Sequence, residues 1–226
     1  MARRSNPEPN QTEVGARRIC MITGGTGGIG LSAAMAIGAS GYDLLLVGRN
    51  TAQGAAAVQS VNAIAHGPAA TFLQADLSSQ AEVKRLAAAV RSGWPRIDAL
   101  VHSAGTVQQR RRESADGVEL TWAVNHLAPF LLTYMLLGTL QVSSPSRVIV
   151  VSSRSHRWGR MHWADPELHR GYNLLRAYSQ SKLANLLFVQ ELNQRLSGLG
   201  VYATVVHPGL VRTGIARDVS GLAAFV

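Results

Sequence analysis

The stretch TGGTGGIG, residues 23–30, follows the apolar run 19–22 and holds five glycines in eight positions. After a strand, such a stretch lets the backbone turn tightly and lets a pyrophosphate approach the N–H groups that begin the next helix. Two glycine spacings of dinucleotide sites fit it at once: Gly25-x-Gly27-x-x-Gly30 and the narrower Thr23-Gly24-x-x-x-Gly28-x-Gly30. Each is a weak signal alone, so the rest of the chain has to decide.

Short, β-branched apolar runs alternate with longer helix-compatible segments from residue 18 onward. The runs are continuously apolar, as expected of strands buried on both faces. The predicted strands are Arg18–Thr23, Tyr42–Val47, Ala70–Gln74, Ile97–His102, Arg147–Ser152 and Val201–Val206. The predicted helices are Ile29–Ser40, Ala52–His66, Gln80–Ser92, Gly117–Leu140 and Asn173–Ser197. This repeated βαβ order predicts an α/β fold, a Rossmann-type doubly wound parallel sheet of six strands with helices on both faces.

The composition is that of one globular domain. The chain has 226 residues, of which 46% are hydrophobic and 15% charged, enough for one sizeable α/β core and short for two. We expect residues 1–17 to form a flexible tail and residues 18–226 to form a single Rossmann domain. The one cysteine, Cys20, lies in an apolar run and is expected to be a buried, unreactive thiol.

The net charge is +9, but the basic residues are not arranged as in a nucleic-acid-binding surface. Its densest run, Arg110–Arg112, has no interleaved aromatic residues, so we favour a solvated basic loop over a nucleic-acid interface. No apolar stretch follows the N-terminal arginines, and the longest apolar run elsewhere, Phe130–Leu140, is too short and mixed to span a bilayer, which needs about 20 residues. We therefore expect a cytoplasmic protein without signal peptide or integral membrane segment.

The second strand ends in Gly48 and Arg49, at the carboxyl edge where such sheets bind ligands. The nearest acid, Asp43, begins that strand and so lies away from the ligand edge. A guanidinium at this edge pairs with a ribose 2′-phosphate, whereas a carboxylate there would bind the free 2′-hydroxyl. Arg49 therefore favours NADP(H) over NAD(H). A solvent-exposed arginine that opens a helix is the simpler alternative.

Two further strand ends carry residues suited to a dinucleotide. Asp76, after the third strand, either accepts a hydrogen bond from an adenine amino group or caps the next helix, and the sequence leaves both open. The fourth strand leads into Ser103, Ala104 and Gly105, small residues that let the backbone lie close to a cofactor.

A Tyr-x-x-x-Lys pair, Tyr178 and Lys182, follows the fifth strand and shares one face of the predicted helix. An ammonium beside a phenol favours the phenolate, so we expect the pKa of Tyr178 to be lowered. A tyrosine tuned in this way can exchange a proton with an alcohol at neutral pH. A serine at the end of the fifth strand could hold the same substrate oxygen. Such a pair is common by chance, and its position after the fifth strand gives it weight.

In this order, these residues resemble the short-chain dehydrogenase/reductase family, over the chain from about residue 18 onward. The resemblance selects the narrower glycine spacing. The matching positions are Thr23-Gly24-x-x-x-Gly28-x-Gly30, Asp76, Ala104-Gly105, Asn125, Ser152-Ser153, Tyr178-x-x-x-Lys182, Pro208-Gly209 and Thr213.

The resemblance implies an oxidoreductase that moves hydride between a nicotinamide cofactor and a carbonyl or alcohol. It implies Tyr178 as the catalytic acid/base, Lys182 as the ligand of the nicotinamide ribose that also lowers the Tyr178 pKa, and Ser153 as the residue that orients the substrate carbonyl. Asn125 is similar to the asparagine that holds a proton-relay water beside the lysine. The implied cofactor-binding residues are Thr23, Gly24, Gly28, Ile29, Gly30, Arg49, Asp76, Leu77, Ala104, Gly105, Tyr178, Lys182, Pro208, Gly209 and Thr213.

The interval between Ser153 and Tyr178, with the phrases NHLAPFLLT and VVSSRSH, looks like the retinol-dehydrogenase-like group. That group includes relatives of the WW-domain oxidoreductase, and the likeness implies a bulky apolar substrate. Three side chains of the intervening loop either line such a pocket or pack within the loop: Trp158, Met161 and Trp163. Three histidines lack a convincing zinc-ligand spacing, so we expect no metal: His156, His162 and His169.

Two departures from the family pattern stand out. His102 and Ser103 occupy positions where the family usually has two asparagines, which puts sheet-stabilising hydrogen bonds in doubt. The chain ends soon after Thr213, whereas family members continue through a substrate-covering helix and a last parallel strand. We therefore expect Val201–Val206 to be an apolar sheet edge, open to pairing with a second copy in a homodimer. A cofactor-binding protein without turnover is the main alternative function, and an epimerase or dehydratase a weaker one.

Overall fold

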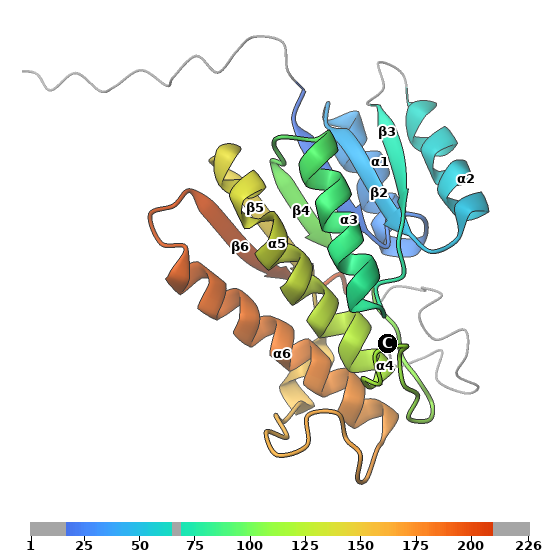
Figure 1. The fold of residues 1–226 in the computed structure, drawn as a ribbon, viewed down its shortest axis with the longest axis vertical. Coiled ribbons are helices and arrows are strands. Elements are labelled where there is room, and N and C mark those ends of the chain that lie inside the picture. Colours follow the sequence, from blue (N-terminus) through green and yellow to red (C-terminus); the bar gives the residue numbers. More distant parts are fainter. Residues whose placement is uncertain (1–16, 65–68, 210–226) are drawn as a thin grey trace, which may run out of the picture.

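The computed structural model describes residues 17–64 and 69–209, and within them helices and strands alternate as the sequence predicts (Figure 1). One six-stranded sheet has the order β3-β2-β1-β4-β5-β6, and all neighbouring strands run parallel. Its strands are β1 (Ile19–Thr23), β2 (Asp43–Gly48), β3 (Ala70–Gln74), β4 (Ala99–His102), β5 (Ser146–Val151) and β6 (Val201–Val206). The predicted Rossmann-type sheet is confirmed.

The helices lie near their predicted places, with one exception. The segment predicted as a single helix over Gly117–Leu140 begins at Leu120 and contains a π turn. The predicted end of the second helix, His66, lies outside the described residues. The helices are α1 (Gly28–Ala39), α2 (Thr51–Asn62), α3 (Gln80–Gly93), α4 (Leu120–Trp122), the π turn η1 (Ala123–Leu127), α5 (Ala128–Val142), the 3₁₀ turn η2 (Arg154–Trp158) and α6 (Leu174–Arg195).

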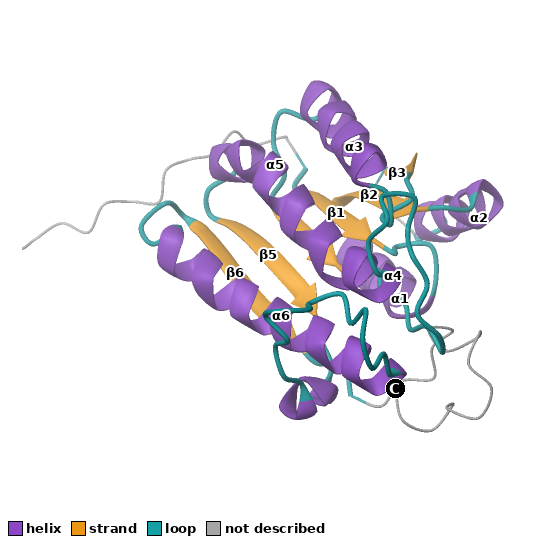
Figure 2. Ribbon diagram, turned by 60° about the horizontal axis from the view of Figure 1, so that its bottom comes forward, coloured by secondary structure: helices purple, strands orange, loops and turns teal. Residues whose placement is uncertain are grey.

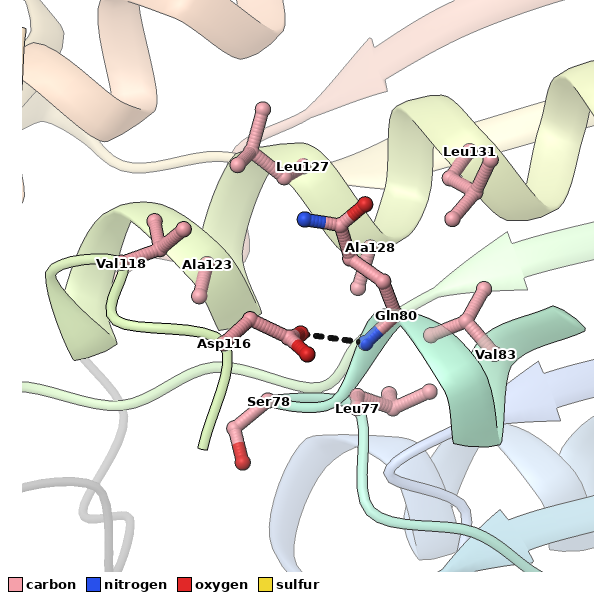
Figure 3. Close-up of a pocket in the computed structure, with 10 residues that line it drawn as sticks. All are labelled: Leu77, Ser78, Gln80, Val83, Asp116, Val118, Ala123, Leu127, Ala128 and Leu131. Atoms are coloured by element: carbon pink, nitrogen blue, oxygen red, sulfur yellow. Dashed lines mark hydrogen bonds between the residues drawn. The ribbon is translucent and has the colours of Figure 1, made fainter. Parts of the chain in front are cut away.

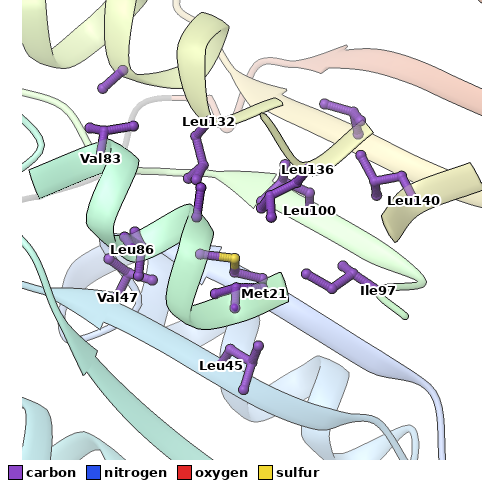
Figure 4. Packing of buried hydrophobic residues seen from close by; sticks show 14 of the residues in the cluster. Met21, Leu45, Val47, Val83, Leu86, Ile97, Leu100, Leu132, Leu136 and Leu140 are labelled. Atoms are coloured by element: carbon purple, nitrogen blue, oxygen red, sulfur yellow. The ribbon is translucent and has the colours of Figure 1, made fainter. Parts of the chain in front are cut away.

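Helices cover both faces of the sheet. The helices α3, α5 and α6 lie across one face, and α1 and α2 pack on the other (Figures 1 and 2). Alternate residues of each strand enter the two cores: Met21 and Leu45 face α3 and α5, whereas Cys20 and Leu44 face α1 and α2. Figure 4 shows the larger core, where Leu132, Leu136 and Leu140 of α5 meet β-strand side chains.

Cys20 behaves as the sequence predicts. Its thiol is fully buried and free, and burial raises its pKa to about 12. A thiol that stays protonated in an apolar core is unreactive. The predicted tail, residues 1–17, lies outside the described residues except for Arg17, which pairs with Asp43 at 3.5 Å.

The strand β6 forms one edge of the described sheet, because it pairs only with β5. On the face opposite α6, Tyr202 is 56% exposed and Val206 is 41% exposed. The described helices on that face, α1 and α2, therefore leave β6 uncovered. The prediction that β6 is an open sheet edge holds within the described residues.

One helix has the length and composition of a membrane span. Among the described residues it is Leu120–Val142, which is 23 residues long; an 18-residue window within it has a mean hydropathy of 1.3, and half of that window is buried in the structure. Leu132, Leu136 and Leu140 are fully buried in the main core. The buried half of this stretch is apolar because it packs on the sheet, where one helix face must match the strands.

Candidate active site

The glycine turn after β1 packs against the end of β4 so closely that side chains do not fit. A Cβ on Gly24, whose φ is +68°, would lie 2.8 Å from the backbone N and Cα of Ala104. A Cβ on Gly30 would collide with the carbonyl oxygen of Gly24. Gly24 is needed for its positive φ and its contact with Ala104, and Gly30 is needed because the first turn of α1 lies directly on the loop.

The start of α1 suits an anionic group. Its N-cap, Gly27, offers no side-chain cap, and the first turn contains no acidic residue. The N–H of Leu31 bonds the Gly27 carbonyl, so the N–H groups of Gly28, Ile29 and Gly30 precede the intrahelical ladder. A Cβ on Gly27 would meet nothing within 4 Å. Open space in front of free N–H groups fits a cofactor pyrophosphate.

Hydrogen bonds of Thr23 and of the Gly24 N–H connect the end of β1 to β4 and β2. The Thr23 hydroxyl donates to the carbonyl of Val101 at 3.4 Å and accepts from the N–H of Ala104 at the same distance. The N–H of Gly24 donates to the Val47 carbonyl at 2.9 Å. With Thr23 fully buried, its side chain places the two loops that face the cofactor edge.

Arg49 lies where the sequence places it, exposed beyond the carboxyl end of β2. Within residues 17–64 and 69–209, no carboxylate forms an ion pair with it. Asp43 begins β2 at the opposite edge, where it accepts a hydrogen bond from the N–H of Ala69 at 2.9 Å. The carboxyl edge of β2 is thus positive, as a 2′-phosphate requires.

Asp76 does not cap the next helix. Ser79 is the N-cap of α3, while Asp76 Oδ1 accepts from the N–H and hydroxyl of Ser78 at 2.9 and 2.8 Å. The capping interpretation is therefore wrong, and Asp76 shapes the turn before α3.

Beside Asp76, Leu77 lines a hollow between α3 and the η1–α5 segment, closed on one side by the hydrogen bond from the Gln80 N–H to Asp116 (Figure 3). The lining contains neither Tyr178 nor Lys182, so this hollow is separate from their site.

Tyr178 lies on α6 beside the end of β5 and is 6% exposed. The Ser153 side chain hydrogen-bonds its phenol and acts to lower the phenol pKa. Burial acts in the opposite direction and dominates, so the pKa of Tyr178 is raised. The predicted lowering by Lys182 is wrong for this structure, because the Lys182 Nζ lies 5.5 Å from the Tyr178 ring centroid and burial removes solvent from the phenolate.

Lys182 sits one turn beyond Tyr178, with its side chain almost fully buried. Its Nζ donates to the carbonyl of Val151 at 3.0 Å, and the hydroxyl of Ser152 donates to the Lys182 carbonyl at 3.1 Å. These two bonds clamp α6 to the end of β5. Burial lowers the pKa of the Lys182 ammonium to about 8, close to neutral pH.

Replacing Lys182 by methionine is expected to raise the Tm of the cofactor-free protein by about 5 °C at pH 7. The folded pKa of Lys182, about 8, lies below its ordinary value of 10.5. Between these values the unfolded chain binds more protons, so the stability of the unmodified protein rises with pH. The advantage of Lys182→Met should therefore shrink toward pH ~10.5, as thermal melts at several pH values would measure. An equal Tm difference at every pH would contradict this.

Asn125 is buried within η1 and binds two other segments. Its Oδ1 accepts from the N–H of Thr106 at 2.8 Å, and its Nδ2 donates to the Thr106 carbonyl at 3.0 Å and to the Ser181 hydroxyl at 3.1 Å. Ser181 in turn donates to the Tyr178 carbonyl at 2.8 Å. The loop after β4, the π turn and α6 thus meet at this side chain.

The remaining predicted residues lie at strand ends, in the loop before α6 or outside the described residues. Ala104, Gly105, Pro208 and Gly209 follow the carboxyl ends of β4 and β6, as expected of the ligand edge, and Thr213 lies outside the described residues. Trp158 and Trp163 are 78% and 77% exposed, so they do not pack within the loop. Within the described residues, no cluster of three metal-ligating side chains occurs.

His102, one of the departures from the family pattern, is fully buried at the end of β4. Its Nε2 lies 2.8 Å from the Thr133 hydroxyl of α5, and burial lowers its pKa to about 3. A neutral histidine therefore links the strand to the helix at this position.

Known proteins with this arrangement point to one family. Residues 18–221 match the family model described as short chain dehydrogenase. The chain belongs to the short-chain dehydrogenase family. That match spans the glycine turn, the Tyr178–Lys182 helix and the segment after β6, so it supports the alignment of all the motifs to one family.

Curated relatives within this family include retinol dehydrogenases. The chain is 34% identical to retinol dehydrogenase 14 of Mus musculus, with 96% of this chain and 70% of that protein aligned. It is 39% identical to dehydrogenase/reductase SDR family member 13 of Bos taurus, with 90% and 54% aligned. For retinol dehydrogenase 12 of Bos taurus the identity is 36%, with 88% and 63% aligned. The chain thus spans about half to two thirds of most of these relatives.

Solved structures share the fold. A short-chain dehydrogenase from Sphingobium yanoikuyae in complex with NADPH superposes with a TM-score of 0.73 at 26% identity, covering 89% of this chain and 74% of that one. The Pseudomonas aeruginosa RhlG/NADP active-site complex gives 0.70 at 27% identity, covering 89% and 75%. Family members bind a nicotinamide cofactor, and the glycine turn described above fits one.

Sequence reasoning missed three polar residues around Asn125: the buried Ser181 and Asn185, and the half-buried His126. The signal was available for two of them. Ser181 and Asn185 follow Tyr178 at helical spacings of three and seven, which places all three on one face of α6. The role of His126 depends on the π turn, which a regular helical pattern does not reveal.

Proposed function

We propose that this protein is an NADP(H)-dependent oxidoreductase that interconverts a bulky apolar carbonyl compound and its alcohol. The observation that carries the proposal is the buried phenol of Tyr178, hydrogen-bonded by Ser153 at the carboxyl edge of the sheet and next to Lys182. A glycine turn that fits a dinucleotide opens onto the same edge, two strands away.

In this proposal the bound nicotinamide supplies or accepts the hydride, and the chain supplies the proton. The Ser153 hydroxyl, which already contacts the Tyr178 phenol, donates a hydrogen bond to the substrate carbonyl oxygen and holds it in reach of that phenol. Tyr178 stays protonated at neutral pH because burial raises its pKa, so it is ready to donate its proton to the oxygen. Lys182 lies beside this phenol, with its Nζ 5.5 Å from the Tyr178 ring centroid.

We further propose that Arg49 selects NADP(H). Arg49 is exposed, follows the carboxyl end of β2 and has no carboxylate partner in the described part of the chain. Two structural relatives were solved with NADP or NADPH bound, which agrees with this choice. An arginine pairs with a phosphate through charge-assisted hydrogen bonds, and NADH offers no such group.

Replacing Arg49 by glutamine is expected to weaken NADPH binding roughly 10- to 100-fold and to leave NADH binding nearly unchanged. The matched control is Arg195→Gln, which removes the same charge at the far end of α6, where Arg195 pairs with Glu191. Titration of cofactor fluorescence measures both affinities. Equal losses for NADPH and NADH, or equal effects of the two variants, would remove Arg49 from its role in cofactor choice.

The substrate class is tested by incubating the protein with NADPH and a panel of carbonyl compounds that spans small polar ketones, apolar aromatic ketones and long polyene aldehydes. Loss of NADPH absorbance with the apolar members supports the proposal, since several relatives are named retinol dehydrogenases. Tight NADPH binding without consumption by any member of the panel would contradict it.

A further inference from the structure

Two buried side chains of α6 hold Asn125, one at each end of the residue. Ser181 binds the Asn125 side-chain amide, and Asn185, 1% exposed, donates from its Nδ2 to the Asn125 main-chain carbonyl at 2.8 Å. Because Ser181 and Asn185 are one turn apart, with Tyr178 and Lys182 on the same stretch, the helix that carries the proposed acid/base also fixes the π turn. Rotation of η1 would break both bonds.

The Asn125 main-chain carbonyl determines how the Asn185 amide is oriented, and the amide in turn determines which His126 nitrogen carries the hydrogen. A carbonyl oxygen only accepts hydrogen bonds, so the nitrogen of the Asn185 amide must face Asn125. The Asn185 Oδ1 then faces the His126 Nδ1, 3.1 Å away, and that nitrogen must carry the hydrogen. The centroid of the His126 ring lies 4.5 Å from that of Trp122, with the two rings tilted by 41°, and burial lowers the His126 pKa, which keeps the ring neutral. The hydrogen-bond chain therefore has one direction: His126 to Asn185 to Asn125.

We propose that Asn185, which also accepts a hydrogen bond from His126, is a positioning residue that fixes the Asn125 carbonyl for the proton path beside Lys182. The proposal rests on the oxidoreductase function proposed above. A carbonyl oxygen has two lone pairs, and Asn185 uses one of them, so the other remains for the relay water that the family resemblance assigns to this asparagine. A carbonyl that accepts a buried hydrogen bond keeps one direction, and a fixed direction keeps the relay water in one place.

The sharpest test is Asn185→Asp, which keeps the shape and replaces the donor by an acceptor. Above the pKa of the new carboxyl, two oxygens face each other at the Asn125 carbonyl, and only the protonated acid can donate. We expect kcat to fall by about ten- to a hundredfold at pH ~8 and to recover partly toward pH ~5.5, while KM for NADPH changes little. In the cofactor-free variant, amide hydrogen exchange across 123–127 should be faster than in the unmodified protein at pH ~8, and this difference should shrink toward pH ~5.5.

Asn193→Asp is the matched control. Asn193 lies on the same helix, donates from its Nδ2 to the Ala203 carbonyl at 2.9 Å and accepts from the Ala203 N–H at 2.9 Å. The substitution therefore places a carboxylate against a backbone carbonyl away from Asn125, at a more exposed position on the same helix. It is expected to lower Tm while leaving the pH profile of kcat and the exchange of 123–127 unchanged.

The outcomes separate this proposal from the proposed function. Similar pH profiles and similar exchange rates for Asn185→Asp and Asn193→Asp would overturn the positioning role. If the unmodified protein consumed no NADPH with any carbonyl, the oxidoreductase proposal would fail, and the exchange comparison would still decide whether Asn185 holds the π turn. Should Asn185→Asp not fold, His126→Phe, which keeps the ring and removes the Nδ1 donor, should show the same faster exchange; unchanged exchange in that variant would overturn the proposal.

Discussion

Replacing Tyr178 by phenylalanine is expected to lower kcat by about 10²- to 10⁴-fold and to leave the Kd for NADPH within about twofold. The phenylalanine ring fills the same buried space, so only the hydroxyl and its hydrogen bond with Ser153 are lost. The loss falls on proton donation to the substrate oxygen, not on cofactor contacts. Steady-state rates and a fluorescence titration of NADPH measure the two quantities separately.

Tyr172→Phe is the matched control for that experiment. Tyr172 lies in the loop before α6. Its hydroxyl is also partly buried and donates to the carbonyl of Gln108 at 2.9 Å. Its removal should cost about 1 kcal/mol of stability and little activity. If the kcat of Tyr178→Phe equalled that of Tyr172→Phe, the phenol of Tyr178 would have no part in the chemistry.

Replacing Gly30 by alanine is expected to destabilise the fold by about 3 kcal/mol, the second large effect. The new methyl group would collide with the Gly24 carbonyl, and helix α1 can retreat only by breaking its contact with the loop. Urea unfolding of the cofactor-free protein measures the change. An unchanged midpoint would show that the loop and α1 are not packed as described.

Gly27→Ala separates folding from binding at the same turn. A Cβ there meets nothing within 4 Å, and the N-cap backbone is extended, which alanine adopts freely. We expect stability within about 1 kcal/mol of the unmodified protein. NADPH binding should weaken at least about tenfold, because the methyl group is added at the N-cap of the helix start that we propose binds the pyrophosphate. Undiminished affinity would place the pyrophosphate elsewhere.

The sheet could be predicted from the sequence because it follows from local patterns. Continuous apolar runs and the glycine turn gave six strands within a few residues of their observed ends. The start of β4 at Ala99 rather than Ile97 depends on a distant contact, since the Asp98 carboxylate accepts the Ile19 N–H at 2.8 Å. No local pattern shows that bond.

The sequence shows which residues follow the carboxyl ends of the strands, but it does not show the electrostatics around them. The Tyr178–Lys182 spacing is visible in the sequence, whereas the raised pKa of Tyr178 depends on how much solvent the fold removes. The π turn at Asn125 was missed for a related reason: it is held by Thr106, Ser181 and Asn185, which lie far from it along the chain. Periodicity describes a helix, and only tertiary contacts describe its interruption.

The central claim is that Tyr178 and Ser153 hold a substrate carbonyl where hydride from a bound nicotinamide can reach it. The most direct measurement uses NADPH carrying deuterium at the transferring position, an apolar aldehyde and mass spectrometry of the alcohol formed. The account predicts one deuterium on the former carbonyl carbon, with none appearing on the same timescale when Tyr178→Phe replaces the unmodified protein. Labelled cofactor that binds tightly while no deuterium reaches any carbonyl of the panel would contradict it.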